Sequence, residues 1–154
     1  MDALALASNR TVFADIRANS KKGLFQEVAQ RLSLALKVDA RDLFSALLER
    51  ERLGSTGMGR GVAIPHCRLP DVSEIFGAMV RLETPIEFDA IDREPVDLFF
   101  FLIAPQSAGS DHLRALARVS RVLRDNAVRE RLRGAKTYDA LLAALDEFDR
   151  PRAA

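Results

Sequence analysis

The stretch Val96-Asp97-Leu98-Phe99-Phe100-Phe101-Leu102-Ile103-Ala104 decides which fold this chain can adopt. Its residues are apolar at almost every position, so a strand formed here has two hydrophobic faces instead of one. A strand of this kind lies at the centre of a sheet that is covered on both sides. Helical patterns both precede and follow the stretch in the sequence. Together these features predict an α/β fold, a three-layer α/β/α sandwich in a single domain.

Two helices are predicted before the central strand. The first begins at Ser20 or Lys21, and its apolar residues recur every four positions between residues 24 and 36. The second begins near Asp39 or Asp42 and ends near Gly54. Arg50 is therefore expected in the last turn of a helix that leads into a glycine-rich segment.

The remaining elements are predicted from shorter patterns. They are a first strand within residues 12–16, a strand over residues 75–82, a helix over residues 110–126 capped by Ser110 or Asp111, and two short helices over residues 128–133 and 137–148. Residues 85–95 are rich in proline and acidic side chains and predict no regular structure, although Ile86 and Phe88 alternate as in a short strand. The core is expected within about residues 12–148, with both tails frayed.

Length and charge exclude several classes of protein. The 154 residues match one domain, and 23 basic against 22 acidic side chains do not indicate a nucleic-acid-binding surface. A single cysteine fits a reducing compartment. Asp2 is unlike the start of a secretion signal, and no uncharged run reaches the roughly 18 residues of a membrane helix. We therefore expect a cytoplasmic protein without membrane insertion.

A glycine-rich segment precedes a histidine on a constrained backbone. It reads Gly54-Ser55-Thr56-Gly57-Met58-Gly59-Arg60-Gly61 and is followed by Val62-Ala63-Ile64-Pro65-His66. The glycines allow the backbone to approach a bound group closely and to offer N–H donors, and Pro65 restrains the chain before His66. The glycine spacing matches neither the phosphate-binding loop nor the dinucleotide fingerprint. The arrangement favours an imidazole that reacts with, or carries, an anion.

The same residues resemble a known family. Arg50-Glu51, Gly54-Ser55-Thr56-Gly57, Gly59 and Gly61 to His66 are similar to the active-site signature of IIA domains of the bacterial phosphoenolpyruvate-dependent phosphotransferase system (PTS), in the fructose/mannitol class and most closely its nitrogen-regulatory members. The similarity continues in Leu82 to Ile86, Phe88 to Asp92, Pro95 to Leu98 and His112-Leu113, over about residues 20–144. It departs at Cys67, where the family most often has glycine. The resemblance implies a mixed sheet and one PTS IIA type-2 domain over residues 1–154.

His66 and His112 are the only histidines and the first candidates for phosphoryl chemistry. A neutral imidazole is a good nucleophile near pH 7, because its unperturbed pKa of about 6.5 leaves a lone pair free. The alternative for His66 is a structural histidine bonded to a backbone carbonyl, and for His112 an exposed residue at a helix start. The resemblance assigns His66 as the phosphoryl acceptor. It assigns His112, where helix N–H groups favour an anion, to orienting His66 or binding the phosphoryl group.

Arginine and loop residues complete the candidate site. A planar arginine fork suits phosphoryl oxygens, and the resemblance selects Arg50 over Arg52 and Arg60 for this role. The candidates for a phosphoryl-binding loop are Ser55, Thr56, Gly57, Gly59 and Gly61, although the two hydroxyls could equally satisfy the loop itself.

Neither a metal nor a cofactor is expected. Cys67 follows His66 directly, and adjacent side chains on an extended segment point to opposite faces, so the pair does not suggest a metal site. The sequence has no other cluster of metal-ligand spacing. Positioned donors suffice for phosphoryl transfer, so the chain itself needs no cofactor.

Two functions remain open at this point. The first is a phosphotransferase component of mainly regulatory role, which accepts a phosphoryl group on His66 from a phosphorylated histidine-containing phosphocarrier protein. Its phosphorylation state then controls regulatory targets, and the resemblance implies targets such as potassium-transport or sensor-kinase proteins. The alternative is a sugar-specific IIA component that passes the group to a IIB domain. We expect a stand-alone domain, because 154 residues leave no room for a fused IIB or permease unit.

Overall fold

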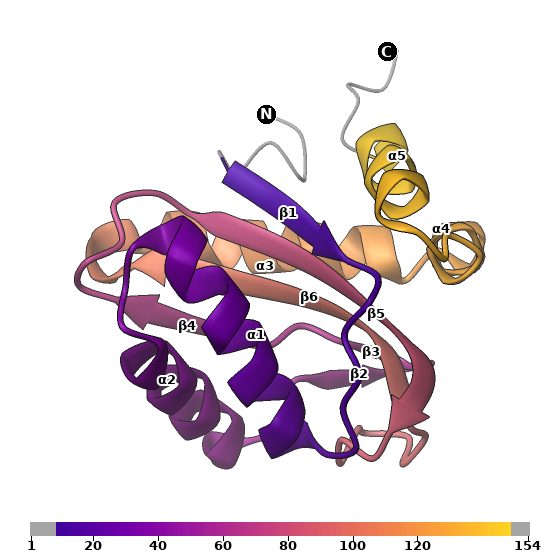
Figure 1. The fold of residues 1–154 in the computed structure, drawn as a ribbon, viewed down its shortest axis with the longest axis horizontal. Helices are drawn as coiled ribbons and strands as arrows, with labels where there is room; N and C mark the ends of the chain where they lie inside the picture. The colour runs from indigo at the N-terminus through magenta and orange to yellow at the C-terminus, as the bar shows by residue number, and fades with distance from the viewer. Residues whose placement is uncertain (1–8, 149–154) are drawn as a thin grey trace.

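The sheet is built around strand β6 (Val96–Pro105) in the computed structural model, which describes residues 9–148 (Figure 1). The strand order is β1-β5-β6-β3-β2, and β4 also pairs with β6. β5 (Phe76–Ile86) runs antiparallel to β6, whereas β3 (Val62–Ala63) and β4 (His66–Leu69) run parallel to it. β1 (Asn9–Phe13) is parallel to β5, and β2 (Gly57–Gly59) is antiparallel to β3. The predicted mixed sheet is therefore confirmed.

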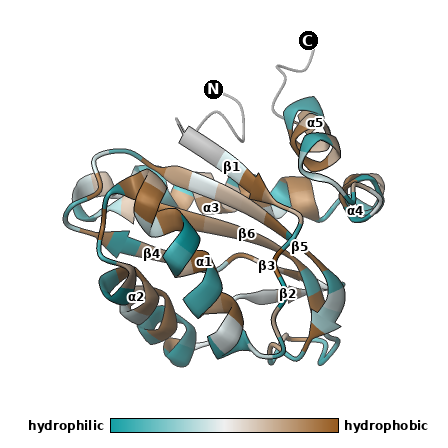
Figure 2. Cartoon of the chain, in the orientation of Figure 1, coloured by the Kyte–Doolittle hydropathy of each residue, from teal (hydrophilic) through white to brown (hydrophobic). Residues whose placement is uncertain are grey.

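The side chains of β6 alternate between two separate cores. Phe99, Phe101 and Ile103 belong to one buried cluster, and Leu98, Phe100 and Leu102 belong to the other. This alternation follows from the period of two along a strand. Figure 2 shows β5 and β6 as hydrophobic through the middle of the molecule. The doubly apolar stretch is thus central because both of its faces are covered.

Helices α1 (Lys21–Leu36) and α2 (Ala40–Leu53) cover one face of the sheet (Figure 1). The Ser20 hydroxyl accepts a hydrogen bond from the Gly23 N–H, and the Asp39 carboxylate accepts from the N–H groups of Arg41 and Asp42. These caps satisfy backbone donors that lack a partner at a helix start. Within this core, the ring of Phe25 meets that of Phe101 edge to face, with centroids 5.7 Å apart.

The opposite face is covered by α3 (Ser110–Leu123), α4 (Asn126–Arg133) and α5 (Tyr138–Phe148), after a short 3₁₀ turn over Gln106–Ala108. Two predictions about α3 are wrong. Neither Ser110 nor Asp111 caps it, because the cap position is Gly109, which has a φ of 55° and makes no side-chain capping bond. The helix also ends before Asn126, since the Asp125 carboxylate caps the start of α4 instead.

The short strands were the least predictable elements. β3 forms at Val62–Ala63, directly after the glycine-rich segment, and β2 lies in what we expected to be loop. β4 begins at His66, where no strand was predicted. β5 extends past residue 82 to Ile86, through a register shift after Arg81 that accommodates the exposed Pro85. β1 covers Asn9–Phe13, slightly before the predicted residues 12–16.

The helices and the sheet form the expected three-layer α/β sandwich, in one domain. The frayed tails that we predicted at the chain ends fall on residues 1–8 and 149–154, outside the part that the structure describes. Within residues 9–148, no helix combines the length and apolar character needed to span a bilayer.

Candidate functional site

His66 is the first residue of β4, and its backbone is held against the central strand. The Leu102 N–H of β6 donates to the carbonyl oxygen of Pro65 over 3.0 Å, and His66 lies opposite Leu102 in the parallel register. Ile64 and Pro65 separate β3 from β4, so the two short strands follow the same edge of β6. The sequence Ile64-Pro65-His66 thus places the imidazole at a break between two strands.

The His66 imidazole has one possible neutral tautomer in this setting. Its Nδ1 lies 2.8 Å from the Ile64 carbonyl oxygen, and a carbonyl only accepts, so Nδ1 carries the proton. The Nε2 lone pair is then free. The pKa of His66 is lowered, chiefly by burial and further by the positive charges of Arg50 and Arg68. The bond to Ile64 and the negative charge of Glu51 raise it, but by less. His66 is therefore uncharged at pH 7, with Nδ1 bonded to a backbone carbonyl.

His112 meets His66 across the start of α3. The two rings lie edge to face with centroids 5.4 Å apart. His112 is 4% exposed rather than solvent-facing, and its Nδ1 is buried without a protein partner. Burial lowers the pKa of His112 to about 4, with contributions from His66 and Arg68, so this ring is uncharged at pH 7. The alternative of an exposed helix-start histidine is excluded.

Both histidines and Arg50 line one cavity of about 660 Å³. Arg50 lies in the last turn of α2, and its Nη1 donates to the Gly54 carbonyl oxygen over 2.9 Å. Arg52 and Arg68 also line the cavity, against a single acidic residue, Glu49. Arg60 is not among the lining residues. The structure therefore brings His66, His112 and Arg50 together in a positively charged hollow.

Exposed leucines flank this cavity. Leu53 at the end of α2 is 85% exposed, and Leu113 in the first turn of α3 is 64% exposed. Both line the cavity that holds His66. Large apolar side chains grouped at a cationic hollow are typical of a surface that contacts another protein.

Glu51 is a buried residue behind the site to which the sequence reasoning gave no role. Its carboxylate is buried and accepts from Lys21 Nζ at 3.0 Å, from the Thr56 N–H at 3.0 Å and from the Thr56 hydroxyl at 2.6 Å. The Thr56 carbonyl accepts from the Ile64 N–H, and the Ile64 carbonyl accepts from His66 Nδ1. Glu51 thus anchors a chain of bonds that ends on His66. Its position four residues after Leu47, on the buried stripe of α2, was the available signal.

The loop hydroxyls are engaged within the protein. Ser55 Oγ donates to the Phe88 carbonyl oxygen over 2.9 Å and accepts from the Gly57 N–H. The Thr56 hydroxyl is bonded to Glu51. Neither residue lines the His66 cavity, so both serve the structural role that we left open for them. A role in phosphoryl binding stays a prediction.

The glycines of the predicted loop form the β2–β3 hairpin and do not line the His66 cavity. A Cβ at Gly57 would lie 2.7 Å from the Cβ of Ala90. Gly61 has a φ of 79°, and a Cβ there would collide with the Arg133 guanidinium. Gly57 and Gly61 are therefore explained by close packing and backbone conformation, without a bound group.

Cys67 lies next to His66 and also lines the cavity, but its side chain is buried. It packs in the core cluster under α1 and α2, and burial raises the pKa of its thiol to about 12. A thiol of this kind is unreactive at neutral pH. The side chain acts as a small buried apolar residue.

Comparisons with known proteins agree with this geometry. The chain matches the family model described as "Phosphoenolpyruvate-dependent sugar phosphotransferase system, EIIA 2" over residues 5–148. It is 43% identical over 140 residues to a nitrogen regulatory protein of Bradyrhizobium diazoefficiens, covering 91% of this chain and 92% of that one. It is 37% identical over 129 residues to a PTS system fructose-specific EIIA component of Haloferax volcanii, covering 83% and 84%.

A solved structure supports the same assignment. The nitrogen regulatory protein IIA-Ntr from Neisseria meningitidis superposes with a TM-score of 0.79 at 36% identity, covering 91% of this chain and 94% of that chain. The match of the family model spans all of the described residues that form the three-layer fold and the histidine site. This chain belongs to the EIIA 2 family of the phosphoenolpyruvate-dependent sugar phosphotransferase system.

Proposed function

We propose that this chain is a phosphoryl carrier of the nitrogen-regulatory type, with His66 Nε2 as the acceptor atom. The observation that carries the proposal is the bond from His66 Nδ1 to the Ile64 carbonyl, since it leaves Nε2 as the basic nitrogen. The reduced pKa keeps the ring neutral, as a nucleophile must be. The nitrogen regulatory relatives favour the regulatory role over a purely metabolic one.

The transfer is a single exchange of bonds. The donor is a phosphohistidine on a histidine-containing phosphocarrier protein. The Nε2 lone pair of His66 forms a bond to phosphorus while the donor P–N bond breaks and its electron pair returns to the donor imidazole. The His66 Nδ1 proton stays on the ring, bonded to Ile64. Passing the group onward reverses these changes.

The cationic cavity suits the charge of the transferred group. Arg50 and Arg68 offer planar guanidinium forks to phosphoryl oxygens, which carry the charge in the transition state. His112, uncharged at pH 7, orients the His66 ring or donates to one oxygen. Fixed donors of this kind stabilise the transition state without reorganisation. Exposed Leu53 and Leu113 supply an apolar contact for a protein donor.

The site of phosphorylation is the first test. The chain is incubated with the phosphorylated phosphocarrier, and the modified residue is identified by mass spectrometry and by ³¹P–¹⁵N couplings. One acid-labile phosphate on Nε2 of His66 is expected, and none on His66→Ala. A phosphate bonded to Nδ1, or full labelling of His66→Ala, would disprove the assignment.

The regulatory role has its own test. A phosphoryl group adds about 1.5 to 2 negative charges to this surface. A partner that buries the surface would then meet an uncompensated charge, which costs several kcal/mol. Calorimetry of captured partners, including potassium-transport and sensor-kinase proteins, should give different affinities for the unmodified and phosphorylated chains. Equal affinities for every partner would leave a simple carrier.

A sugar-specific component is the second candidate. Its support is the similarity to the fructose-specific component of Haloferax volcanii. The same cavity would then deliver the phosphoryl group to a IIB domain. Rapid transfer from phosphorylated chain to a fructose or mannitol IIB domain, and none of the partner effects above, would favour this candidate.

A further inference from the structure

A second cationic cavity lies at the other end of α3. Its volume is about 540 Å³, and it is lined by the β2–β3 hairpin, by Ile91 and by the corner between α3 and α4. Three arginines line it, Arg60, Arg124 and Arg129, and no acidic residue does. It shares no lining residue with the His66 cavity. The 12-residue span from His112 to Arg124 along α3 corresponds to about 18 Å.

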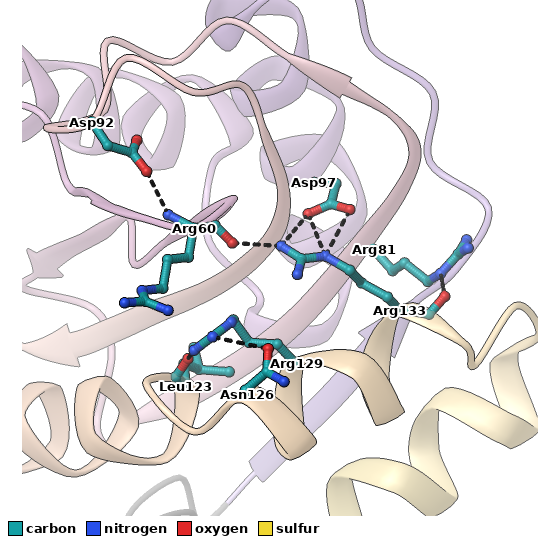
Figure 3. A network of polar contacts seen from close by, with 8 residues as sticks. All are labelled: Arg60, Arg81, Asp92, Asp97, Leu123, Asn126, Arg129 and Arg133. Carbon is teal, nitrogen blue, oxygen red and sulfur yellow. Dashed lines mark hydrogen bonds and ion pairs between the residues drawn. The ribbon is translucent and has the colours of Figure 1, made fainter.

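Arg129 is a buried cation without an anionic partner. It is 3% exposed, and it donates to the carbonyl oxygen of Leu123 at 3.0 Å and to the side-chain oxygen of Asn126 at 3.3 Å (Figure 3). It also donates to the carbonyl oxygen of Arg124 at 2.6 Å. All three acceptors are neutral. The nearby carboxylate of Asp125 accepts from backbone N–H groups of α4 instead. A buried charge is normally paired with an opposite one.

The backbone of Arg60 is fixed on both sides. Its N–H donates to Asp92 Oδ2 over 2.8 Å, and its carbonyl oxygen accepts from Arg133 Nη2 over 2.6 Å (Figure 3). Arg133 is itself bonded by two nitrogens to Asp97. These bonds hold Arg60 at a φ of 59°, a conformation that is uncommon for residues other than glycine. The arginine therefore reaches the cavity from a rigid hairpin.

The helix end explains only part of this arrangement. Arg129 satisfies the last carbonyl groups of α3, which a cation at a helix C-terminus commonly does. That role does not account for two further arginines at the same hollow. Among residues 11–148, whose side chains the structure describes, the ion pairs of arginine involve Arg31, Arg114, Arg131 and Arg133, and none includes Arg60, Arg124 or Arg129. Three like charges around one cavity repel each other unless an anion lies between them.

We propose that this cavity binds a phosphate-bearing small molecule. Guanidinium groups from the hairpin, from the end of α3 and from α4 can reach different oxygens of one phosphate, whereas a single carboxylate offers only two. Ser120 and Asn126 also line the cavity and add a hydroxyl and an amide. The ligand occupies a site separate from His66 and is held without a covalent bond.

The test is titration calorimetry at low ionic strength with inorganic phosphate, pyrophosphate and acetate. Wild type is compared with the double variant Arg60→Gln/Arg124→Gln, whose side chains are exposed and leave Arg129 in place. The matched control is Arg17→Gln/Arg121→Gln, which removes the same charge at exposed positions elsewhere. Backbone amide shifts of Gly59, Arg60 and Asn126 locate the bound anion.

The expected result is binding of pyrophosphate that weakens about tenfold or more in the first double variant and stays within about twofold in the control. No binding to wild type, or equal weakening in both double variants, would overturn the proposal. So would loss of binding in Arg50→Gln alone, because the anion would then occupy the His66 cavity. Acetate bound as tightly as phosphate would exclude the phosphate class. Phosphorylation of His66 is measured independently, so its failure leaves this result unaffected.

Discussion

The rings of His66 and His112 meet edge to face, with centroids 5.4 Å apart and planes inclined at 73°. One ring begins β4 and the other lies in the first turn of α3, so the contact joins the sheet edge to the helix layer behind it. Both pKa values are lowered, mainly by burial. Two uncharged imidazoles therefore share a hollow whose positive charge comes from arginines.

Replacing His112 with alanine should slow phosphoryl transfer without unfolding the protein. The ring is expected to orient His66 or bind the phosphoryl group rather than to react, and losing one such contact commonly costs about 10²–10³ in rate. The measurement is a single-turnover rate with phosphorylated carrier, beside a denaturant unfolding curve. A rate equal to that of wild type in a folded variant would return His112 to a packing role.

Acidification should destabilise the fold through His112. Its folded pKa is about 4 against 6.5 for the unperturbed residue, so between these values the unfolded chain binds a proton that the folded chain does not. Stability is thus full above pH 6.5 and falls on acidification, by up to about 1 kcal/mol per pH unit, until about pH 4. Urea unfolding of wild type and His112→Gln between pH 7.5 and pH 4 isolates this contribution. A difference between the two proteins that does not change with pH would contradict it.

Arg50→Lys should transfer slowly although it keeps the positive charge. An ammonium group lacks the planar fork that holds two oxygens at once, and it also loses the geometry of the bond to the Gly54 carbonyl. We expect a loss of about tenfold or more in the single-turnover rate. Arg60→Lys is the matched control, because Arg60 lies outside the His66 cavity. Slow transfer by the control and normal transfer by Arg50→Lys would show that the wrong arginine was chosen.

Glu51→Gln should both destabilise the fold and slow transfer. The change removes the buried carboxylate that pairs with Lys21, whose side chain is only 19% exposed, and leaves the exposed Asp89 as its other partner. It also weakens the bond to the Thr56 N–H, so we expect a loss of about 1–3 kcal/mol in unfolding free energy. The His66 ring should then lose its fixed tautomer, which ¹⁵N shifts of the imidazole report. Glu87→Gln, at an exposed carboxylate, is the control. A stable variant with unchanged imidazole shifts would mean that Glu51 does not position His66.

Several features could be predicted from the sequence because they depend on local patterns. The stretch over residues 96–104 predicts a strand buried on both faces, and the structure divides its side chains between two cores. Four-residue spacing predicts α1, because one face of the helix must be apolar to pack on the sheet. An aspartate at the start and Gly54 at the end predict α2. The Gly-to-His motif led to His66 by resemblance, and the resemblance also brought in His112 and Arg50.

Only the tertiary structure decided the rest. β2 and β4 are too short to carry a periodic signal, and they exist because β3 and β6 present edges that pair with them. The motif glycines Gly57 and Gly61 pack closely against Ala90 and Arg133 and do not line the His66 cavity. Their place in the sequence is therefore explained by contacts with residues that are distant along the chain. The two cationic cavities form only when the helix ends, the hairpin and the sheet edge come together. Sequence patterns therefore could not reveal the role of Glu51 and Arg68, or the group formed by Arg60, Arg124 and Arg129. The sequence by itself determined which segments are buried, and its motif pointed to His66 as the candidate acceptor. The protonation states and the charge clusters depend on distances between residues far apart in the sequence, which only the folded chain defines.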